Sequence, residues 1–371
     1  MIVPLLDLRA QHAAIREAVM PAVLSVIERQ QFIMGPEVES LEAAIARLSG
    51  VRHAIGCASG TDALLLPLKA LDLRPGDEVI VPPFTFFATA GTVHNAGGRP
   101  VFADIEPDTF NLSPEAVEAA ITPRTRAIIV VHLFGQMAKM EQILALAAKR
   151  GLPVIEDAAQ AIGARRRMSG AWRMAGETGW AGTLSFFPSK NLGAWGDGGM
   201  ILAQDDALAE RMRRLRLHGG TRQYHHDEVG TNSRLDTLQA AVLLAKLPFL
   251  AGWSAARREK AAAYTAAFGG HGAVVPPAVD PANEHIFHQY TVRAPRRDGL
   301  LSHLKARGIG CAVYYPLALH LQPCFSFLGY RPGSLPAAEA ATAEVVSLPV
   351  YPELTGAQQA EVVRAVTEFY D

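Results

Sequence analysis

A lysine beside aromatic residues and a glycine-rich turn is the first feature of this sequence that could do chemistry. Lys190 lies in the stretch Ser185–Gly193, and Trp195 and the turn Gly196–Gly199 follow it. Burial disfavours the ammonium form, so it lowers the pKa of a lysine and favours the nucleophilic amine. Such a lysine can form a Schiff base with a carbonyl group. An ordinary surface lysine is the alternative, and this stretch alone leaves both interpretations equally open.

Small and hydroxyl-bearing residues follow a predicted strand at residues 52–57. Gly60 and Thr61 lie where the next helix is expected to begin, so free backbone N–H groups and the Thr61 hydroxyl would hold a phosphate. Ser185, five residues before Lys190, would give that phosphate a second hydroxyl. An ordinary helix cap is the alternative, and the segment around Gly60 taken alone favours it.

Two further strand ends carry aromatic rings and a carboxylate. The segment 82–89, P-P-F-T-F-F-A-T, offers a ring that would stack on a planar cofactor, although core packing explains such a segment equally well. Asp157 follows the apolar run Val154–Ile155, and a buried carboxylate there needs a cationic partner such as a protonated pyridine nitrogen. Helix capping is the alternative role for Asp157.

These groups together match one cofactor. A lysine for an imine, an acid for a pyridinium, an aromatic ring, and hydroxyls beside a helix N-terminus are the parts that pyridoxal 5′-phosphate (PLP) requires. Four such matches in one chain arise by chance much less often than one. The residues therefore predict a PLP site.

The bulk composition excludes several other classes of function. Charged residues make up 19% of the 371 residues and the net charge is −1, so no basic field for nucleic acid or anionic lipid is evident. The three cysteines lack disulfide or metal-ligand spacing, which suits a reducing compartment and argues against a metal site. The N-terminus lacks the features of a signal peptide, and no apolar run approaches the roughly 20 residues that span a bilayer. We expect a soluble, cytoplasmic protein without nucleic-acid or membrane partners.

Short β-rich runs alternate with longer helical stretches between about residues 50 and 220. This alternation predicts an α/β fold, with a mostly parallel sheet covered by helices. Ligands of such sheets bind beyond the carboxyl ends of the strands, which is where the residues above lie. The predicted strands are 52–57, 78–81, 100–103, 127–131, 153–155, 183–187 and 200–202.

A second unit is expected in the last third of the chain. Two consecutive helices at 236–247 and 253–268 precede a segment rich in glycine and proline. The sequence then predicts strands at 289–292 and 311–315, and helices at 300–307, 337–345 and 356–369. We therefore expect a large PLP-binding domain over residues 1–250 and a smaller C-terminal α/β domain over 251–371, against which the N-terminal segment could pack.

Several motifs jointly resemble the DegT/StrS-type family of PLP-dependent sugar-nucleotide aminotransferases, which have the aspartate-aminotransferase fold (fold type I). The resemblance implies that Lys190 holds PLP as an internal aldimine and that Asp157 contacts the pyridine nitrogen. It places Phe86 on the ring, Gln160 near the ring hydroxyl, and the phosphate on three residues, Gly60, Thr61 and Ser185. The motifs are F-I-M-G-P (32–36), S-G-T-D-A-L (59–64), P-P-F-T-F-F-A-T (82–89), E-D-A-A-Q (156–160), S-F-F-P-S-K-N-L-G (185–193), G-D-G-G (196–199), Y-P (315–316) and S-L-P (347–349).

The same resemblance implies a symmetric homodimer with shared active sites. The residue matching Asn232 reaches the cofactor phosphate of the neighbouring subunit, and Arg234 approaches the substrate. Tyr314 and His320 are expected to contact the substrate too. Both differ from their counterparts in an enzyme that aminates a UDP-linked 3-keto uronate.

The implied reaction moves an amino group from glutamate to a UDP- or dTDP-linked 3-ketosugar, for amino-sugar and polysaccharide biosynthesis. Lys190 would shuttle the proton in a ping-pong cycle. A 4-ketosugar or cyclitol aminotransferase of the same family remains an alternative, as does a PLP-binding regulatory protein without turnover. A dehydratase of this fold would have histidine in place of Lys190.

Overall fold

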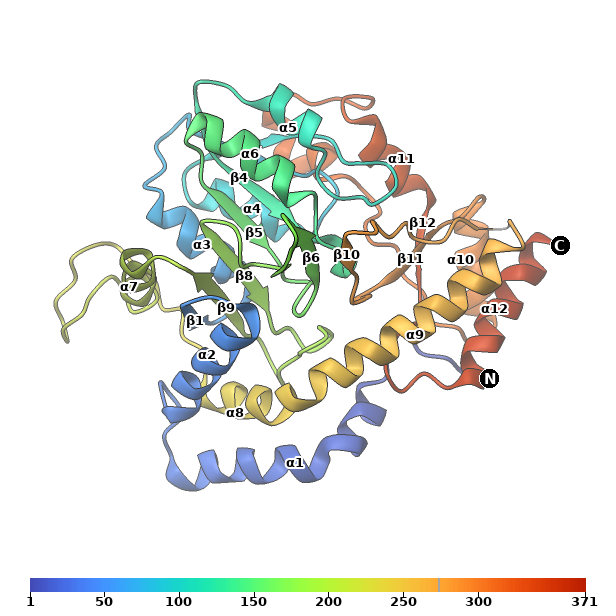
Figure 1. Ribbon diagram of the computed structural model, residues 1–371, viewed down its shortest axis with the longest axis horizontal. Helices are drawn as coiled ribbons and strands as arrows, with labels where there is room; N and C mark the ends of the chain where they lie inside the picture. The colour runs from blue at the N-terminus through green and yellow to red at the C-terminus, as the bar shows by residue number, and fades with distance from the viewer. Residues whose placement is uncertain (273) are drawn as a thin grey trace.

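A seven-stranded sheet forms the centre of the molecule in the computed structural model, which describes residues 1–272 and 274–371 (Figure 1). The strand order is β1-β9-β8-β5-β4-β2-β3. Adjacent strands are parallel except for β9, which runs antiparallel to both β1 and β8. The strands are β1 (His53–Cys57), β2 (Glu78–Val81), β3 (Arg99–Phe102), β4 (Thr125–Val131), β5 (Val154–Asp157), β8 (Ala181–Ser185) and β9 (Gly199–Ala203).

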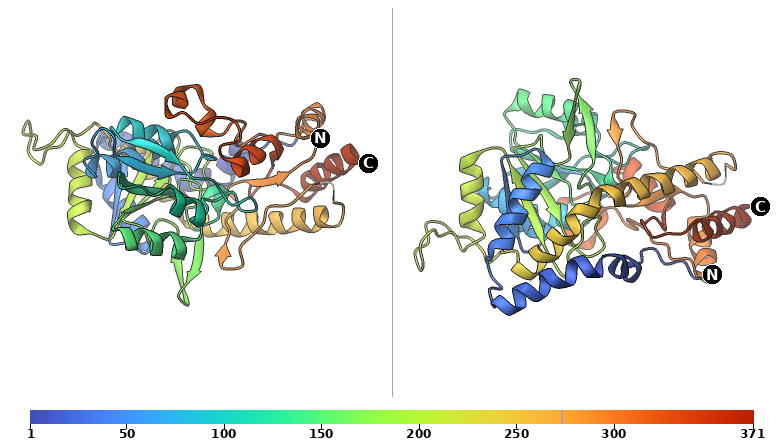
Figure 2. Two further views of the ribbon diagram at one scale, coloured as in Figure 1. Left: turned by 90° about the horizontal axis from the view of Figure 1, so that it is seen from above. Right: turned by 60° about the horizontal axis from the view of Figure 1, so that its bottom comes forward.

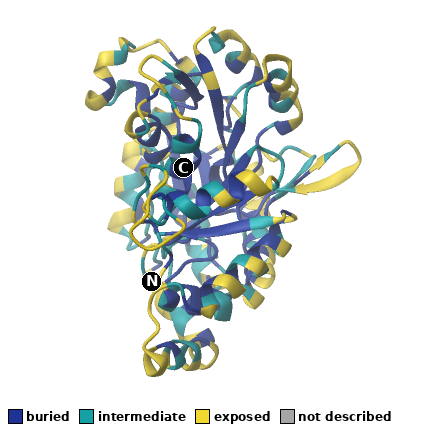
Figure 3. Ribbon diagram, turned by 90° about the vertical axis from the view of Figure 1, so that its left-hand side faces the viewer, coloured by how far each residue is buried: buried dark blue, intermediate teal, exposed yellow. Residues whose placement is uncertain are grey.

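Helices cover both faces of this sheet because successive side chains of each buried strand point to opposite sides. In β4, Ile128 and Val130 belong to one hydrophobic core, whereas Ala127, Ile129 and Val131 belong to another. The first core is shared with α2 (Pro36–Ser49), α5 (Pro114–Ala120), α6 (Met140–Arg150) and α8 (Thr237–Lys246). The opposite face packs on α3 (Gly60–Ala70), α4 (Ala88–Asn95), α7 (Asp206–Leu215) and α11 (Pro336–Glu344). Figure 3 shows the strands of this sheet mostly buried between helices with exposed outer faces.

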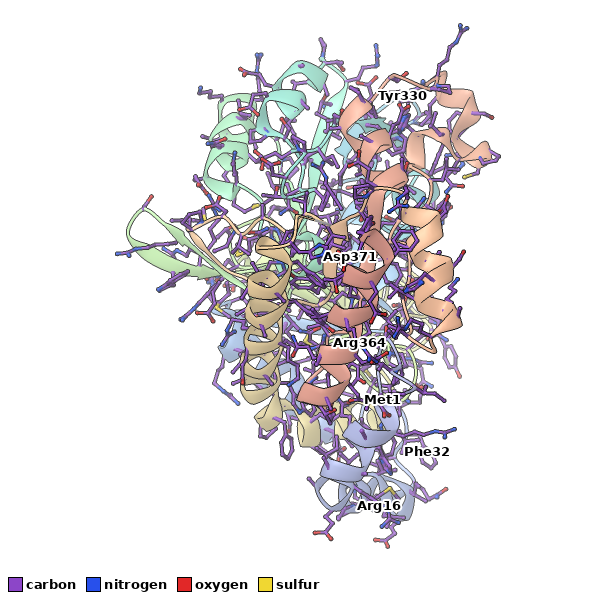
Figure 4. All side chains as sticks on the ribbon, turned by 90° about the vertical axis from the view of Figure 1, so that its right-hand side faces the viewer. Met1, Arg16, Phe32, Tyr330, Arg364 and Asp371 are labelled. Atoms are coloured by element: carbon purple, nitrogen blue, oxygen red, sulfur yellow. The ribbon has the colours of Figure 1, made fainter. Side chains whose placement is uncertain are left out.

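A third core holds the C-terminal unit together. It combines the two-stranded sheet of β11 (Tyr290–Arg293) and β12 (Val345–Leu348) with α9 (Leu250–Gly269), α10 (Arg297–Ala306) and α12 (Gly356–Tyr370). Val3 belongs to this core and forms a bridge with Ile309 before α1 (Leu8–Arg29) begins. Figures 1 and 4 accordingly show the N-terminus beside α12. The described residues also include the 3-10 helices η1 (Leu133–Gly135), η2 (Leu247–Phe249), η3 (Leu319–Leu321) and η4 (Pro323–Leu328).

A hairpin that the sequence pattern did not predict projects from the body of the molecule (Figure 2). It consists of β6 (Arg165–Met168) and β7 (Ala171–Met174), and β10 (Asn283–Glu284) pairs with β6. The basic and polar residues of this segment lack a clear alternation of apolar and polar side chains, so the period-two signal of a strand is missing.

The predicted strand at 311–315 is wrong. Only Ala312 forms an isolated bridge, with Ser347, and the partner of β11 is β12 instead. Tyr315 packs its ring on Phe84, with centroids 5.9 Å apart, and accepts a hydrogen bond from Gln160. The aromatic residues of this segment, which favour strands, thus pack against other rings and do not pair in a sheet.

The expectation that no apolar run is long enough to cross a membrane needs correction. The helical run Thr237–Gly269, from α8 through α9, contains an 18-residue window with a mean hydropathy of 1.3, and by length and composition alone this run could cross a membrane. Core helices of soluble proteins are often equally long and apolar. In this chain α8 packs in the core, and α9 carries four consecutive charged residues at 257–260.

Candidate active site

A cavity of about 410 Å³ lies at the carboxyl ends of the parallel strands. Its walls come from the segments that directly follow β1, β2, β5 and β8, together with two segments of the C-terminal unit. This is the edge at which α/β sheets bind ligands. Of the residues expected to form a site, the following line the cavity: Gly60, Thr61, Phe86, Asp157, Gln160, Ser185, Lys190 and Tyr314.

Lys190 lies on a tight turn after β8. Its backbone N–H donates to the carbonyl oxygen of Phe187 at 2.8 Å, and Lys246 donates to the carbonyl of Gly193 at 2.5 Å. A side chain at Gly193 would place its Cβ 2.3 Å from the carbonyl oxygen of Pro188, so glycine is required for this turn. Burial lowers the pKa of Lys190 to about 8, against the opposing effect of Asp157. A larger fraction of this amine is therefore neutral and nucleophilic at pH 7 to 8 than in an ordinary lysine.

Asp157 is a buried carboxylate with neutral donors only. Thr89 donates its hydroxyl to Oδ2 at 2.9 Å, and the backbone N–H of Ala159 donates to Oδ1 at 3.2 Å. Burial raises the pKa of Asp157, although these two donors and the nearby charge of Lys190 act in the opposite direction. No described lysine, arginine or histidine nitrogen lies within ion-pair distance of this carboxylate. A cation placed in the cavity would fill that role, which fits the protonated ring nitrogen of PLP.

A corner for an anion forms where α3 begins. Ser59 caps this helix by accepting from the N–H of Asp62 at 3.1 Å, while the N–H groups of Gly60 and Thr61 lie in the first turn, which supplies them no acceptor. A Cβ on Gly60 would lie 2.6 Å from the Cβ of Ser185. The close approach brings the Ser185 hydroxyl beside the helix N-terminus, and this donor set fits a phosphate group.

The three phenylalanine rings of the segment 82–89 lie in different environments. Phe86 lines the cavity and is 59% exposed, so its ring is available to a ligand. Phe84 is buried in the core, and Phe87 stacks on Phe325 with centroids 5.6 Å apart. Only Phe86 of the three therefore reaches the cavity.

Gln160 is fixed at both ends of its amide. Its Oε1 accepts from the backbone N–H of Phe134 at 2.8 Å, and its Nε2 donates to the hydroxyl of Tyr315 at 3.0 Å. Tyr315 also lines the cavity. Sequence reasoning quoted Tyr315 in a motif but gave it no role in the site.

A buried pair behind Asp157 was missed by the sequence analysis. The Nε2 atom of His132 lies 2.7 Å from Oε2 of Glu156, and neither side chain is exposed. Glu156 also accepts hydrogen bonds from three backbone N–H groups and one hydroxyl, at Gly176, Thr178 and Gly179. Burial would raise the pKa of Glu156, but these bonds and His132 lower it overall. Glu156 thereby fixes the strand end that presents Asp157. A histidine directly after the apolar run of the neighbouring strand was the available signal.

Three expected site residues lie outside the cavity lining. Asn232 is exposed and forms a bridge with Leu217. Arg234 is partly buried two residues further on. His320 is buried, with Nε2 3.0 Å from Oε1 of Glu339, so its position does not bring it to this cavity.

Comparison with known proteins gives the same fold and a family. The chain matches the DegT/DnrJ/EryC1/StrS aminotransferase family over residues 13–367. It is 52% identical to a protein of Geobacillus stearothermophilus called pleiotropic regulatory protein, covering 100% of this chain and 99% of that one. It is 46% identical to a UDP-N-acetyl-3-dehydro-alpha-D-glucosamine 3-aminotransferase of Acidithiobacillus ferrooxidans, over 98% and 97% of the two chains.

A solved structure confirms the predicted fold class. The crystal structure of DesV from S. venezuelae in complex with a ketimine intermediate superposes with a TM-score of 0.96 at 43% identity, covering 100% of this chain and 99% of DesV. The family match spans nearly all of the sequence. The chain therefore belongs to the DegT/DnrJ/EryC1/StrS aminotransferase family.

Proposed function

We propose that this chain is a PLP-dependent enzyme that moves an amino group from glutamate to the 3-keto carbon of a nucleotide-linked sugar, in the cytoplasm. The observation that carries this proposal is the pairing, in one cavity, of Lys190 with a lowered pKa and the buried carboxylate Asp157. A related solved structure, NtdA of Bacillus subtilis, contains the cofactor PMP at 32% identity to this chain.

Each residue of the cavity has a separate task in this proposal. PLP supplies the carbonyl group and the electron sink of the reaction when it is bound. The neutral amine of Lys190 would hold the cofactor and, whenever it is free, would accept and return a proton at Nζ. Asp157 would keep the ring nitrogen protonated, and Phe86 would offer its ring to the cofactor ring. The helix start at Gly60 and Thr61 and the hydroxyl of Ser185 would bind the phosphate.

Amination at C3 is supported by the names of several relatives. Besides the 3-aminotransferase above, a UDP-2-acetamido-2-deoxy-3-oxo-D-glucuronate aminotransferase and a dTDP-3-amino-3,4,6-trideoxy-alpha-D-glucose transaminase are each 43% identical to this chain. Those names include both nucleotides, so the substrate panel must contain UDP- and dTDP-linked sugars. Tyr314 lines the cavity and is the residue we propose as a contact for the sugar.

A dimer with shared active sites completes the proposal. Asn232 is exposed and outside its own cavity, as expected of a residue that serves the neighbouring subunit. The segment between α7 and α8 projects from the body of the molecule (Figures 1 and 2). Elsewhere in the chain, large apolar side chains are exposed, and exposed apolar side chains suit a subunit interface. They include Phe32, Ile33, Phe187 and Trp195.

A regulatory role without turnover is the second candidate. It is favoured by the 52% identical relative, which carries the name of a regulatory protein. The two candidates differ in a measurable property, because a regulator needs cofactor binding at most, whereas an enzyme must pass an amino group from the donor to the acceptor through the cofactor.

The test is the visible absorbance of the purified protein with PLP. We expect a band from the lysine-bound cofactor that disappears with glutamate and returns with one sugar from a panel of UDP- and dTDP-linked 3-ketosugars. Lys190→Ala should lack this band and all turnover while keeping the wild-type melting temperature. A band that glutamate and every ketosugar leave unchanged would favour the regulatory role. Turnover by Lys190→Ala would contradict the assignment of Lys190.

A further inference from the structure

Ser233 lies between two residues of the expected site and is itself completely buried. Its side chain and that of Leu235 are both 0% exposed. The residues that alternate with them are Asn232, which is exposed, and Arg234, which is partly buried. Such alternation is typical of extended backbone that packs on one face. The two residues with expected roles are therefore presented outward by a segment that is anchored through Ser233 and Leu235.

The Ser233 hydroxyl makes two hydrogen bonds to the turn between β1 and α3. Its Oγ atom accepts from the backbone N–H of Ala58 at 3.2 Å and lies 2.7 Å from Oδ2 of Asp62. A carboxylate oxygen only accepts, so the hydroxyl donates its proton to Asp62. Residues 60–61, which form the phosphate corner with Ser185, lie between these two partners along the chain. One buried hydroxyl thus holds both ends of the turn that carries the corner.

Packing prevents the segment around Ser233 from shifting relative to β1. The backbone N–H of Ser233 donates to the carbonyl oxygen of Arg216 at 3.0 Å, and Nη1 of Arg216 donates to that of Gly56 at 2.7 Å. A Cβ on Gly56 would lie 3.2 Å from the Cβ of Leu235, and a Cβ on Gly198 would lie 2.9 Å from the Cδ1 of this leucine. The segment is thus a fixed support, to which the Ser233 hydroxyl ties the phosphate corner.

The bond to Ser233 also determines where the negative charge of Asp62 lies. Asp62 is the third residue of α3, a position from which a carboxylate commonly folds back onto the helix start. Its backbone N–H bonds to Ser59, but its carboxylate has Ser233 as its hydrogen-bond partner in the described part of the chain. An acid near a helix N-terminus is attracted by the same free N–H groups that would bind a phosphate. Without the Ser233 hydroxyl, the carboxylate would compete with the phosphate for these donors.

We propose that Ser233 is a positioning residue for the cofactor phosphate. Its hydroxyl fixes the phosphate corner on the segment that carries Asn232, and it keeps the carboxylate of Asp62 away from the N–H groups that the phosphate needs. The proposal rests on the proposed function in that the phosphate corner binds the phosphate of PLP.

The test separates phosphate binding from the rest of cofactor binding. The full-length protein, freed of cofactor, is titrated with PLP and with pyridoxal, which lacks the phosphate, and the visible absorbance gives both dissociation constants. For Ser233→Ala we expect the affinity for PLP to fall roughly tenfold, as for one lost hydrogen bond to a charged group. The affinity for pyridoxal should stay at the wild-type value. An equal fall for both compounds, or no fall for PLP, would overturn the proposal.

Ser347→Ala is the matched control. Ser347 is also 0% exposed, and its hydroxyl lies 2.8 Å from that of Thr291 in the C-terminal unit. This variant loses a buried hydroxyl outside the cavity, so both dissociation constants should stay at the wild-type values. A selective loss of PLP affinity in Ser347→Ala would overturn the proposal, because any lost buried hydroxyl would then suffice.

A second variant keeps the test decisive if Ser233→Ala does not fold. Ser233→Cys has a side chain close to serine in size, but its thiol is a weak donor and a weak acceptor. We expect a smaller fall in PLP affinity, again without a change for pyridoxal, and an unchanged preference for PLP would overturn the proposal. Wild-type protein that binds PLP no better than pyridoxal would contradict the phosphate corner itself, and with it the proposed function.

Discussion

Burial of the charged Asp157 carboxylate, which the proposed reaction needs, destabilises the folded protein when no cofactor is bound. Its folded-state pKa is raised by burial, so the stability associated with its protonated form is lost as pH rises through that raised pKa. We expect Asp157→Asn without cofactor to be more stable than wild type at pH 8. The difference should shrink toward an unfolded-state pKa of about 3.9. Thermal melting across pH measures this.

The same substitution should reduce the transamination rate. Removing one partner of a buried charge pair costs about 3–5 kcal/mol, which corresponds to a loss of about a hundredfold to five-thousandfold. Asp298→Asn is the control, because that side chain is 87% exposed and should alter neither property. Wild-type turnover by Asp157→Asn would contradict the role of this carboxylate.

The roles of Lys190 and Asp157 could be predicted from the sequence because their residue types and their neighbours along the chain are characteristic. A lysine before a glycine-rich turn and an aspartate after an apolar run are local patterns. His132 and Glu156 were missed because their function depends on contact across two strands and a loop. Ser233 was missed for the same reason, since nothing in its own segment indicates that its hydroxyl contacts the start of α3.

The end of α8 is tied to the loop that carries Lys190 through one buried lysine. Lys246 is 2% exposed, and burial lowers its pKa to about 8 against the opposing effect of Glu353. The unfolded chain therefore binds more protons than the folded one between pH 8 and about 10.4. Over this range wild type should gain up to about 3 kcal/mol in the free energy of unfolding relative to Lys246→Met.

Urea unfolding at pH 7, 8, 9 and 10 gives this difference directly. Lys149→Met, on the exposed side of α6, is the matched control and should show no such gain. A constant difference between wild type and Lys246→Met over the series would show that Lys246 is not held as a buried amine.

Regular elements were predicted well where one periodicity dominates. The predicted strand 78–81 coincides with β2, and the predicted helix 356–369 agrees with α12 to within one residue. Local pattern was insufficient at residues 311–315, where Val313 and the two tyrosines suggest a strand but pack between the cavity and the core. The antiparallel direction of β9 was equally inaccessible, because strand direction depends on the path of the whole chain.

The proposed function requires a dimer, because each active site is proposed to use residues of both chains. If Asn232 serves the partner's cavity, Lys190→Ala and Asn232→Ala should each be inactive as homodimers. A mixed dimer then contains one cavity with both defects and one intact cavity. After unfolding and refolding an equimolar mixture, we expect about a quarter of wild-type activity per chain, because half of the dimers are mixed. Separately refolded variants are the control, and no recovery on mixing would contradict shared sites.

The position of β9 between β1 and β8 also has a consequence for synthesis on the ribosome. In the sheet, β1 has β9 as its hydrogen-bonded neighbour, and β9 begins only at Gly199. A nascent chain thus exposes an apolar strand with unpaired backbone groups from the emergence of β1 until β9 follows. Such edges promote aggregation and attract chaperones. The phosphate corner, which follows β1 directly, consequently becomes complete late in translation.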